Sequence, residues 1–307
     1  MVKRFLFMII ILLTCSPPRD NPFDPNSPIF KFGFLKGSVK NHYHIPVPYP
    51  EIYILGSQKG CGDSTGNFFF KLEEDSYKVI FSKSGYTSST LSVWIASKDT
   101  LEVFPVIAGI PYFEEVGVAS EFYKGTAIQP DRCYLTIKAE VKDPDGLQDI
   151  DSVKCLIPAD NPYYVTLFPS AGYYEATIKG TSIVTIENWV GRTFRAYAVD
   201  KWGIRGFSRD FTLVRVIKET ANPLYPQNGD SVESPVSFVW RKPDVNFSIH
   251  YQLILYEENG AERIFDTEDT TITLSLNPSR YSYYIRAIDE FGNFSQSTYT
   301  VFYVISK

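Results

Sequence analysis

The segment Cys133–Val141, with the sequence CYLTIKAEV, alternates apolar and polar side chains along its length. In an extended chain successive side chains point to opposite faces, so a two-residue period places every second residue on one side. The apolar side carries Cys133, Leu135, Ile137, Ala139 and Val141. The segment therefore predicts a β-strand with one buried face and one exposed face.

Turn-forming residues follow this segment. Asp143–Gly146, with the sequence DPDG, combines Asp, Pro and Gly, which are the residue types that close tight turns. The alternation then resumes at Val153, Cys155 and Ile157. This order of strand, turn and strand is typical of antiparallel β structure.

The composition of the whole chain agrees with β structure. Aromatic residues make up 16% of the sequence, with 21 Tyr and 23 Phe, whereas there are 2 Met. Aromatic side chains favour strands, and long segments with helical periodicity are hard to find. We expect an all-β protein.

A short internal repeat indicates that two parts of the chain are built alike. Ala198–Gly203, AVDKWG, recurs as Ala287–Gly292, AIDEFG, and a serine follows each copy within a few residues. An Asp at the start of a turn and a Gly that can adopt a positive φ suit a hairpin. We expect each copy to join the last two strands of a β-sandwich.

At 307 residues the chain is too long for one ordinary sandwich. We expect tandem β-sandwiches after a signal peptide and a proline-rich tether. The predicted boundaries are 1–14 for the signal peptide, 15–32 for the tether, and 33–106, 107–217 and 218–307 for three sandwich modules.

The first module carries a recognisable series of strands and turns. In chain order the stretches are Gly37–Val39, Pro46–Leu55, Asp63–Phe70, Tyr77–Val79 and Ser84–Tyr86. They resemble the carboxypeptidase regulatory-like family, a prealbumin-type β-sandwich, although Ser76 stands where that family usually has Gly. The resemblance implies a fold and no chemistry of its own.

The two later modules resemble other sandwich families. Residues 107–217 resemble a bacterial Ig-like domain. Residues 218–307 are similar to fibronectin type III, in which a core Trp and a corner Tyr occupy set positions. The residues at those positions are Trp240, Tyr281, Ile285 and Ala287.

The N-terminus predicts export. Lys3 and Arg4 precede the apolar run Phe5–Leu13, which is too short to span a bilayer and is typical of a signal peptide. Leu12–Cys15 resembles the bacterial lipobox, which implies that Cys15 carries lipid, although Thr14 departs from the usual small residues. Ser16 is not acidic, so we expect the outer membrane or the cell surface rather than the inner membrane.

Two functional classes are disfavoured by the sequence. The net charge is -5 and no Lys/Arg stripe occurs, so nucleic acid is not expected as a partner. Gly62–Gly66 matches G-x-S-x-G, but a nucleophile elbow needs a following helix, and Gly66 leads into a segment rich in strand formers. We therefore expect Ser64 to lie in a hairpin turn and the protein to be no enzyme.

Three kinds of side-chain group remain as candidate sites. One group consists of four aspartates that could bind calcium: Asp143, Asp145, Asp149 and Asp151. Asp, Pro and Gly also favour tight turns, so the residues of this loop need no metal or other cofactor to account for them. His42 and His44 share one side of an extended segment, but no third zinc ligand is evident nearby, so exposed loop histidines are expected. Cys133 and Cys155 form either a disulfide or two buried free thiols, while Cys61 is a lone thiol.

Aromatic residues of the middle module suggest a binding surface. The candidates for a sugar-binding platform are Tyr163, Tyr164, Tyr173, Tyr174, Trp189 and Trp202. We expect a membrane-anchored envelope lipoprotein that presents its modules to an envelope protein. Binding of a polysaccharide is the alternative.

Overall fold

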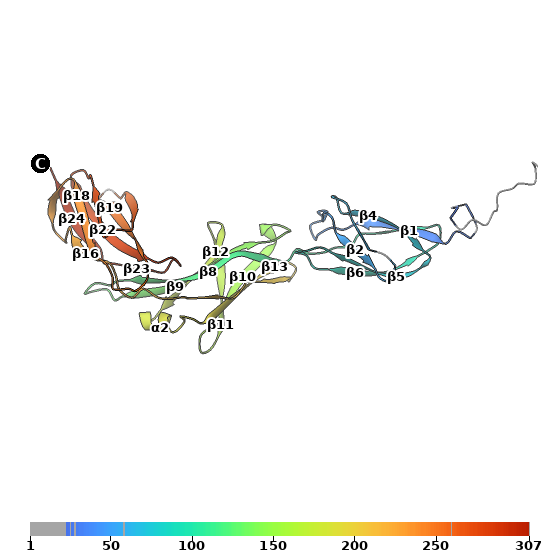
Figure 1. Cartoon of the computed structure of the whole chain (residues 1–307), viewed down its shortest axis with the longest axis horizontal. Helices are drawn as coiled ribbons and strands as arrows, with labels where there is room; N and C mark the ends of the chain where they lie inside the picture. Colours follow the sequence, from blue (N-terminus) through green and yellow to red (C-terminus); the bar gives the residue numbers. More distant parts are fainter. Residues whose placement is uncertain (1–22, 25, 28, 58, 259, 307) are drawn as a thin grey trace, which may run out of the picture. The chain divides into compact units, whose positions relative to one another are not determined.

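The computed structural model describes residues 23–24, 26–27, 29–57, 59–258 and 260–306. The predicted signal peptide and the predicted lipid-attachment residue Cys15 lie outside the described residues. Among the described residues, no helix has the length and apolar character needed to cross a membrane. Strands dominate the structure (Figure 1), which confirms the predicted all-β fold of tandem β-sandwiches.

The chain divides into two compact units. The first unit contains residues up to Ile110 together with the loop Asp143–Gln148, and the second contains Pro111–Lys142 and Asp149–Lys307.

Two sheets form the first unit, with strand orders β4-β1-β7 and β3-β2-β5-β6. Strands β1 and β7 are parallel, and the other neighbours are antiparallel. The strands are β1 (Phe32–Ser38), β2 (Glu51–Ile54), β3 (Lys59–Cys61), β4 (Asn67–Glu73), β5 (Asp75–Ser82), β6 (Ser89–Ile95) and β7 (Thr100–Val103).

Alternating apolar residues of both sheets build the core of the first unit. Leu35 and Phe68 come from one sheet and Phe81 from the other, and all three are buried in one cluster. The rings of Phe68 and Phe81 lie 5.3 Å apart between their centroids. The two sheets therefore pack face to face as a β-sandwich.

The G-x-S-x-G segment forms the turn before β4, as predicted. Asp63 Oδ1 accepts hydrogen bonds from the backbone N–H groups of Thr65 and Asn67, and Gly66 adopts a φ of 74°. Strand β4 follows the turn at Asn67, where a nucleophile elbow would continue as a helix. Ser64 therefore lies in a hairpin turn.

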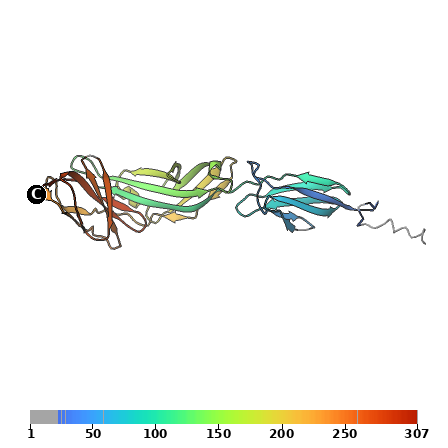
Figure 2. The ribbon, with the colours of Figure 1, turned by 90° about the horizontal axis from the view of Figure 1, so that it is seen from above.

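The second unit begins with a sandwich between Pro111 and Leu213. Its long strands β8 and β9 run side by side as antiparallel neighbours (Figure 2). Its elements are β8 (Tyr112–Tyr123), β9 (Arg132–Lys142), η1 (Leu147–Asp149), β10 (Ile150–Ile157), β11 (Tyr163–Ser170), β12 (Tyr173–Gly180), α2 (Ile183–Glu187), β13 (Thr193–Asp200), β14 (Arg205–Phe207) and β15 (Phe211–Thr212).

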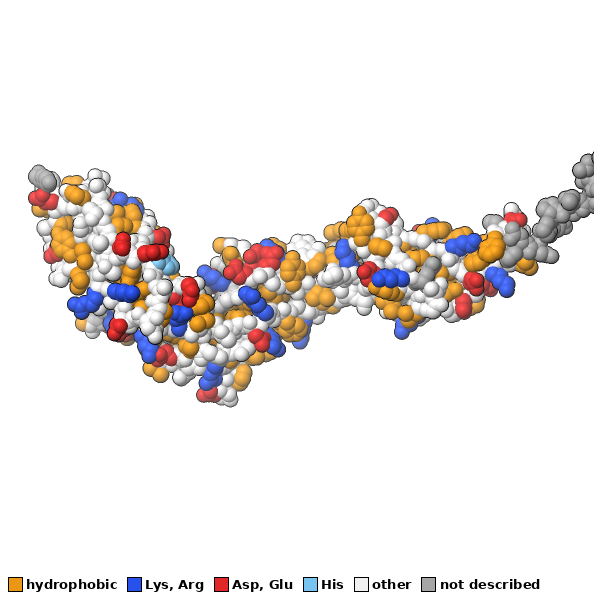
Figure 3. Space-filling model, in the orientation of Figure 1, with side chains coloured by type: hydrophobic (Ala, Val, Ile, Leu, Met, Phe, Trp, Pro, Cys, Tyr) orange, Lys and Arg blue, Asp and Glu red, His pale blue; other side chains and the backbone are white. Residues whose placement is uncertain are grey.

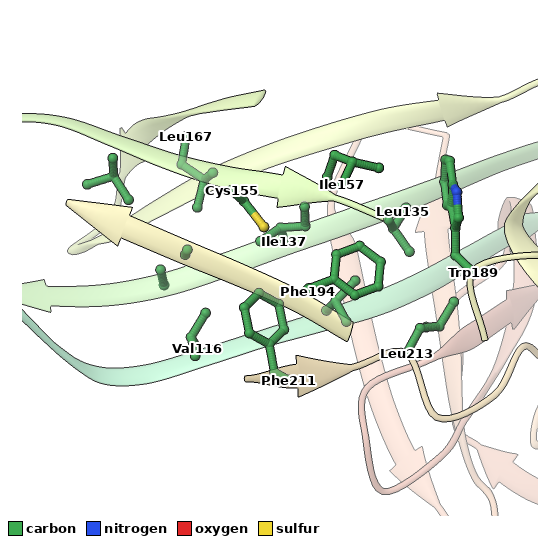
Figure 4. Packing of buried hydrophobic residues seen from close by; sticks show 14 of the residues in the cluster. Val116, Leu135, Ile137, Cys155, Ile157, Leu167, Trp189, Phe194, Phe211 and Leu213 are labelled. Atoms are coloured by element: carbon green, nitrogen blue, oxygen red, sulfur yellow. The ribbon is translucent and has the colours of Figure 1, made fainter. Parts of the chain in front are cut away.

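The apolar face predicted for Cys133–Val141 lies in the core of this sandwich. Leu135 and Ile137 of β9 have no exposed surface, and they pack with Cys155, Phe194 and Trp189 (Figure 4). Burying a large apolar side chain stabilises a fold by about 1.5–3 kcal/mol. The alternating pattern thus predicted which face of the strand is buried.

A second sandwich completes the second unit. It combines a sheet of order β16-β18-β21 with strands β17, β24, β22, β19 and β20. Its strands are β16 (Asn222–Tyr225), β17 (Ser231–Glu233), β18 (Val236–Arg241), β19 (His250–Glu257), β20 (Glu262–Thr267), β21 (Thr271–Leu274), β22 (Ser279–Ile288), β23 (Phe294–Gln296) and β24 (Thr300–Ile305).

Trp240 and Tyr281, two of the residues on which the fibronectin resemblance is based, are both buried in this sandwich. Trp240 is 2% exposed in the core, next to Tyr251, with 5.5 Å between the ring centroids. Tyr281 is buried, and its hydroxyl donates a hydrogen bond of 3.1 Å to the carbonyl of Asn277, four residues upstream. This hydrogen bond has the geometry of a tyrosine corner.

Strand pairing joins the two sandwiches of the second unit. Strand β23 pairs in parallel with β8, so that Phe294 lies opposite Glu121. The Asn293 side-chain oxygen accepts hydrogen bonds from the Ser120 backbone N–H at 2.8 Å and from its hydroxyl at 3.0 Å. One sheet thus continues from one sandwich into the next.

Candidate functional site

A groove of about 680 Å³ lies on the second unit, over the outward-facing side chains of β8, β9 and β12. The tip of the β22–β23 hairpin borders it. Its lining comprises Glu115, Gly117, Val118, Ala119, Glu121, Thr136, Lys138, Glu140, Ser170, Ala171, Tyr173, Glu175, Phe291, Gly292 and Phe294. We call this surface the acidic groove.

Small residues of β8 make the floor of the acidic groove. Val116 and Val118 are buried in the core, so the alternation of the strand turns Gly117 and Ala119 outward. A Cβ atom added at Gly117 would meet no heavy atom within 4 Å. The floor therefore leaves open space where larger residues would fill it.

Four glutamates and one lysine give the lining its charge. Counting Glu115, Glu121, Glu140 and Glu175 as -4 and Lys138 as +1 gives a net charge of -3. The Lys138 ammonium lies 3.7 Å from the Glu175 carboxylate, an ion pair that leaves the acidic excess in place. A cationic ligand would therefore be favoured in the groove.

Hydrogen bonds orient two of these carboxylates. Glu121 accepts one bond from the Thr136 hydroxyl at 2.5 Å and one from the Tyr123 hydroxyl at 2.8 Å. The Lys142 ammonium lies 2.6 Å from Glu140, and its hydrogen bond lowers the pKa of that carboxyl. Both glutamates are thus fixed in position on the strand face.

Aromatic rings border the groove. Tyr173 is 40% exposed and Phe291 is 46% exposed, so both rings remain open to a ligand. The guanidinium of Arg215 lies over Phe291, 5.0 Å from the ring centroid, and pairs with Glu290 at 3.1 Å. These contacts hold the hairpin tip, and with it one wall of the groove.

The predicted aromatic platform is partly correct. Tyr163, Tyr164, Tyr173 and Trp202 are exposed, whereas Trp189 is buried in the core and Tyr174 packs against it. Trp189 follows α2 directly, and its ring lies inside the sandwich (Figure 4). A platform that includes Trp189 is therefore wrong, because this side chain fills the core.

Three aromatic rings, of which the middle one is half-buried, form a row on other strands of the same sandwich. Tyr164 contacts Tyr197 edge to face at 5.4 Å between centroids, and Tyr197 lies 6.1 Å from Phe207. Arg205 lies over the Tyr197 ring at 5.6 Å. We call Tyr164, Tyr197 and Phe207 the aromatic row; of these three residues, Tyr164 alone was predicted from the sequence as part of a binding platform.

Of the aspartates predicted as calcium ligands, Asp145 and Asp151 lie outside the group of buried acidic side chains that the structure brings together. In the first unit, Asp145 accepts hydrogen bonds from Asn41 Nδ2 at 2.9 Å and from the Gly109 N–H at 2.8 Å, while Asp143 accepts one from the Asp145 N–H. In the second unit, Asp149 is buried and Asp151 is exposed on β10. The Asp145 carboxylate thus serves to position loops.

A partner of Asp149 was missed because it lies far along the chain. A carboxylate oxygen of Asp149 and one of Asp200 lie within 4.8 Å of each other. Burial, and with it the charge of Asp149, raises the pKa of Asp200. The repeat had marked Asp200 as a turn residue, without placing it beside Asp149.

The structure contains Cys133 and Cys155 as buried free thiols, the second of the two alternatives. Their strands β9 and β10 are not neighbours, because β12 and β11 lie between them. The Cys155 side chain points into the core cluster (Figure 4), and burial raises its pKa to about 12. Cys61 is exposed.

Among the described residues, the histidines do not join a group of possible metal ligands. His44 is exposed and has a φ of 61°, which a loop residue can adopt. On the face shown in Figure 3, basic and acidic side chains are interspersed without a continuous basic stripe.

No known family matches the sequence, and no curated protein does. Several solved structures resemble the fold at low identity. BcpA, the major pilin subunit of Bacillus cereus, is 12% identical over 90% of this chain and 94% of its own, with a TM-score of 0.31. Fibronectin(III)-like modules of Clostridium thermocellum CbhA are 16% identical over 64% of this chain and 94% of theirs, with a TM-score of 0.32.

A third solved structure contains the FN1–FN3 domains of chicken CNTN1. It is 11% identical over 86% of this chain and 90% of its own, with a TM-score of 0.31. Likenesses of this size carry no information about what the chain binds. Its strands and sheets make the protein a tandem β-sandwich protein.

Proposed function

We propose that the chain is an exported, lipid-anchored and non-enzymatic binding protein of the bacterial cell envelope. The proposal is supported by the cationic start, the apolar run Phe5–Leu13 and Cys15 in the sequence. Two or more acyl chains hold a protein on a membrane durably, at about 0.8 kcal/mol per buried methylene. The proline-rich tether then separates the modules from the lipid surface.

The acidic groove is the surface that supports the binding function best. Its carboxylates are fixed on rigid strands, its floor is open at Gly117, and its rim carries exposed aromatic rings. An arginine or lysine side chain can pair with a carboxylate and stack on an aromatic ring at once. We propose that its occupant is a segment of a partner protein that presents such cationic side chains.

Charge reversal tests this proposal. Glu115 and Glu175 line the groove on different strands, and replacing both with Lys changes the charge of the lining from -3 to +1. We expect Glu115→Lys with Glu175→Lys to abolish co-purification of the partner that the unchanged protein retains. Retention should also weaken at high salt, because screening reduces exposed charge interactions.

The matched control reverses a charge elsewhere on the second unit. Glu262 lies on the edge strand β20, outside the groove lining, so Glu262→Lys should leave the partner bound. Equal retention of the partner by the doubly reversed protein and by the control would contradict the proposal.

Polysaccharide binding is the second candidate, and the aromatic row supports it. Sugar rings stack on exposed aromatic faces, and Tyr164 and Phe207 are 58% and 61% exposed. We expect Tyr164→Ala with Phe207→Ala to remove binding of a cell-wall polysaccharide extract in calorimetry. Tyr303→Ala, at an exposed tyrosine of β24, is the control.

A further inference from the structure

The two copies of the internal repeat form the same hairpin turn, bond for bond. Asp200 Oδ1 accepts hydrogen bonds from the N–H groups of Trp202 and Ile204 at 2.8 and 2.7 Å. In the other copy, Asp289 Oδ1 accepts them from Phe291 and Asn293, both at 2.9 Å. The same turn is therefore available twice for comparison within one chain.

The hydrogen bonds around the two turns also match. Gly203 and Gly292 donate to the carbonyls of Asp200 and Asp289, both at 3.1 Å, and have φ values of 84° and 79°. Further along, the hydroxyls of Ser208 and Ser297 accept bonds from the backbone N–H groups of Ala196 and Ile285. The two copies therefore differ in the residues that contact the turn and not in the hydrogen bonds within it.

The second carboxylate oxygen of each Asp has different surroundings. Asp289 Oδ2 accepts a hydrogen bond from Asn293 Nδ2 at 3.0 Å and lies 3.6 Å from Arg215 Nε. Asp200 Oδ2 is buried and accepts no hydrogen bond from the described residues. Ile204 stands at the place of Asn293 and has no side-chain donor.

The charged neighbour of Asp200 is a carboxylate, whereas Asp289 has a guanidinium as its neighbour. Asp149 has no exposed surface, Asp200 is 2% exposed, and their nearest carboxylate oxygens lie within 4.8 Å. Two negative charges at this distance repel each other strongly away from water, unless a cation lies between them. The first copy therefore lacks the positive charge that Arg215 supplies to the second.

We infer that Asp149 and Asp200 bind a divalent cation of the calcium type, which takes the place that Arg215 occupies in the other copy. Calcium prefers oxygen ligands and completes its shell with backbone carbonyls and water. The ion would join Asp149, the last residue of η1, to Asp200, the last residue of β13. It would thereby brace this end of the sandwich.

Thermal unfolding of the whole chain after removal of metal with EDTA tests the inference. We expect millimolar calcium to raise the melting temperature of the unchanged protein and of Asp151→Asn, an exposed control two residues from Asp149. Asp200→Asn keeps an Oδ1 acceptor for the turn but loses a charged ligand. It should weaken the calcium response by about tenfold or more.

A second measurement needs no variant of the ligands. Terbium substitutes for calcium and emits when a nearby tryptophan is excited, and Trp202 lies two residues from Asp200. We expect terbium emission on tryptophan excitation, displacement of the signal by excess calcium, and a weaker signal in Trp202→Phe.

Two results would overturn the inference. One is a melting temperature and a terbium signal that do not respond to calcium in the unchanged protein. The other is an Asp200→Asn protein that is more stable than the unchanged protein and responds equally to calcium. The second result would mean that the two carboxyl groups share a proton and hold no metal.

Discussion

Gly117 decides whether the acidic groove exists. It occupies an outward-facing position in the middle of β8, where a larger residue would normally cover the sheet, and its missing side chain leaves the floor open. Glycine in a strand interior costs stability because it loses more conformational freedom on folding than other residues. Because Gly117 weakens β8 and at the same time opens the acidic groove, we infer that the groove binds a ligand.

Replacing this glycine should separate stability from binding. We expect Gly117→Val to raise the free energy of unfolding of the second unit by roughly 0.5–1 kcal/mol, since the new side chain meets open space. The same side chain should block the groove and release its partner. Urea denaturation and co-purification measure the two effects, and a destabilised variant would contradict this account of the floor.

The thiols give a second prediction for single residues. Burial raises the pKa of Cys155 to about 12 and also raises that of Cys133, so few thiolates form at pH 8. We expect iodoacetamide to modify Cys61 in the folded protein and to modify Cys133 and Cys155 after unfolding. Mass spectrometry of the labelled peptides measures this.

A disulfide between Cys133 and Cys155 would contradict this prediction. In that case both residues would stay unmodified in unfolded protein until a reductant is added. Such a result would show the disulfide that the sequence had left open as an alternative.

The repeated hairpin is the element that best connects sequence to structure. Its Asp and Gly positions predicted a hairpin between the last two strands of each sandwich. The hairpins β13–β14 and β22–β23 form, but β15 and β24 follow them in the chain. The hairpin tip of the second copy also borders the acidic groove and pairs with β8. One short motif therefore forms a turn, contributes to the junction between the two sandwiches and borders the proposed binding groove.

Asn293 should be the residue on which this junction depends. It is fully buried, and its side-chain oxygen is the acceptor for two Ser120 donors. Asn293→Ala leaves those donors buried without their acceptor, which costs roughly 1–3 kcal/mol. We expect a lower melting temperature of the second unit and faster amide exchange at the paired ends of β8 and β23.

A surface substitution on the same sandwich provides the comparison. Ser237→Ala removes an exposed hydroxyl contact with Thr273 and should change the free energy of unfolding by less than about 0.5 kcal/mol. Unchanged amide exchange at β8 and β23 in Asn293→Ala would contradict the proposed role of Asn293.

Local patterns predicted the elements, while contacts distant in sequence escaped prediction. Alternation identified the buried face of β9, and the strand-forming segment after Gly66 predicted that Ser64 lies in a hairpin turn. The pairing of Asp149 with Asp200 depends on how η1 meets the end of β13, which no local pattern encodes. The groove likewise needs β8, β9 and β12 side by side, although the outward glutamates and Gly117 of β8 were a signal for it.

For the whole molecule, the proposed lipid anchor at Cys15 would determine where the modules act. We expect Cys15→Ser to lose incorporation of labelled palmitate and to move the protein from the membrane fraction to the soluble fraction, because the acyl chains are the anchor. Ser16→Ala, beside the proposed lipid-attachment residue, is the control. Membrane retention of Cys15→Ser would contradict lipid anchoring.

Binding of a protein partner in the acidic groove is the central claim of this account, and photo-crosslinking inside cells tests it most directly. A benzophenone amino acid replaces Ala171 at the groove rim, or Thr166 on β11 as a control outside the lining. We expect a crosslink from position 171 to a segment rich in Lys or Arg, which disappears in Gly117→Val and is absent from position 166. Equal crosslinks from both positions, or crosslinks unaffected by Gly117→Val, would contradict it.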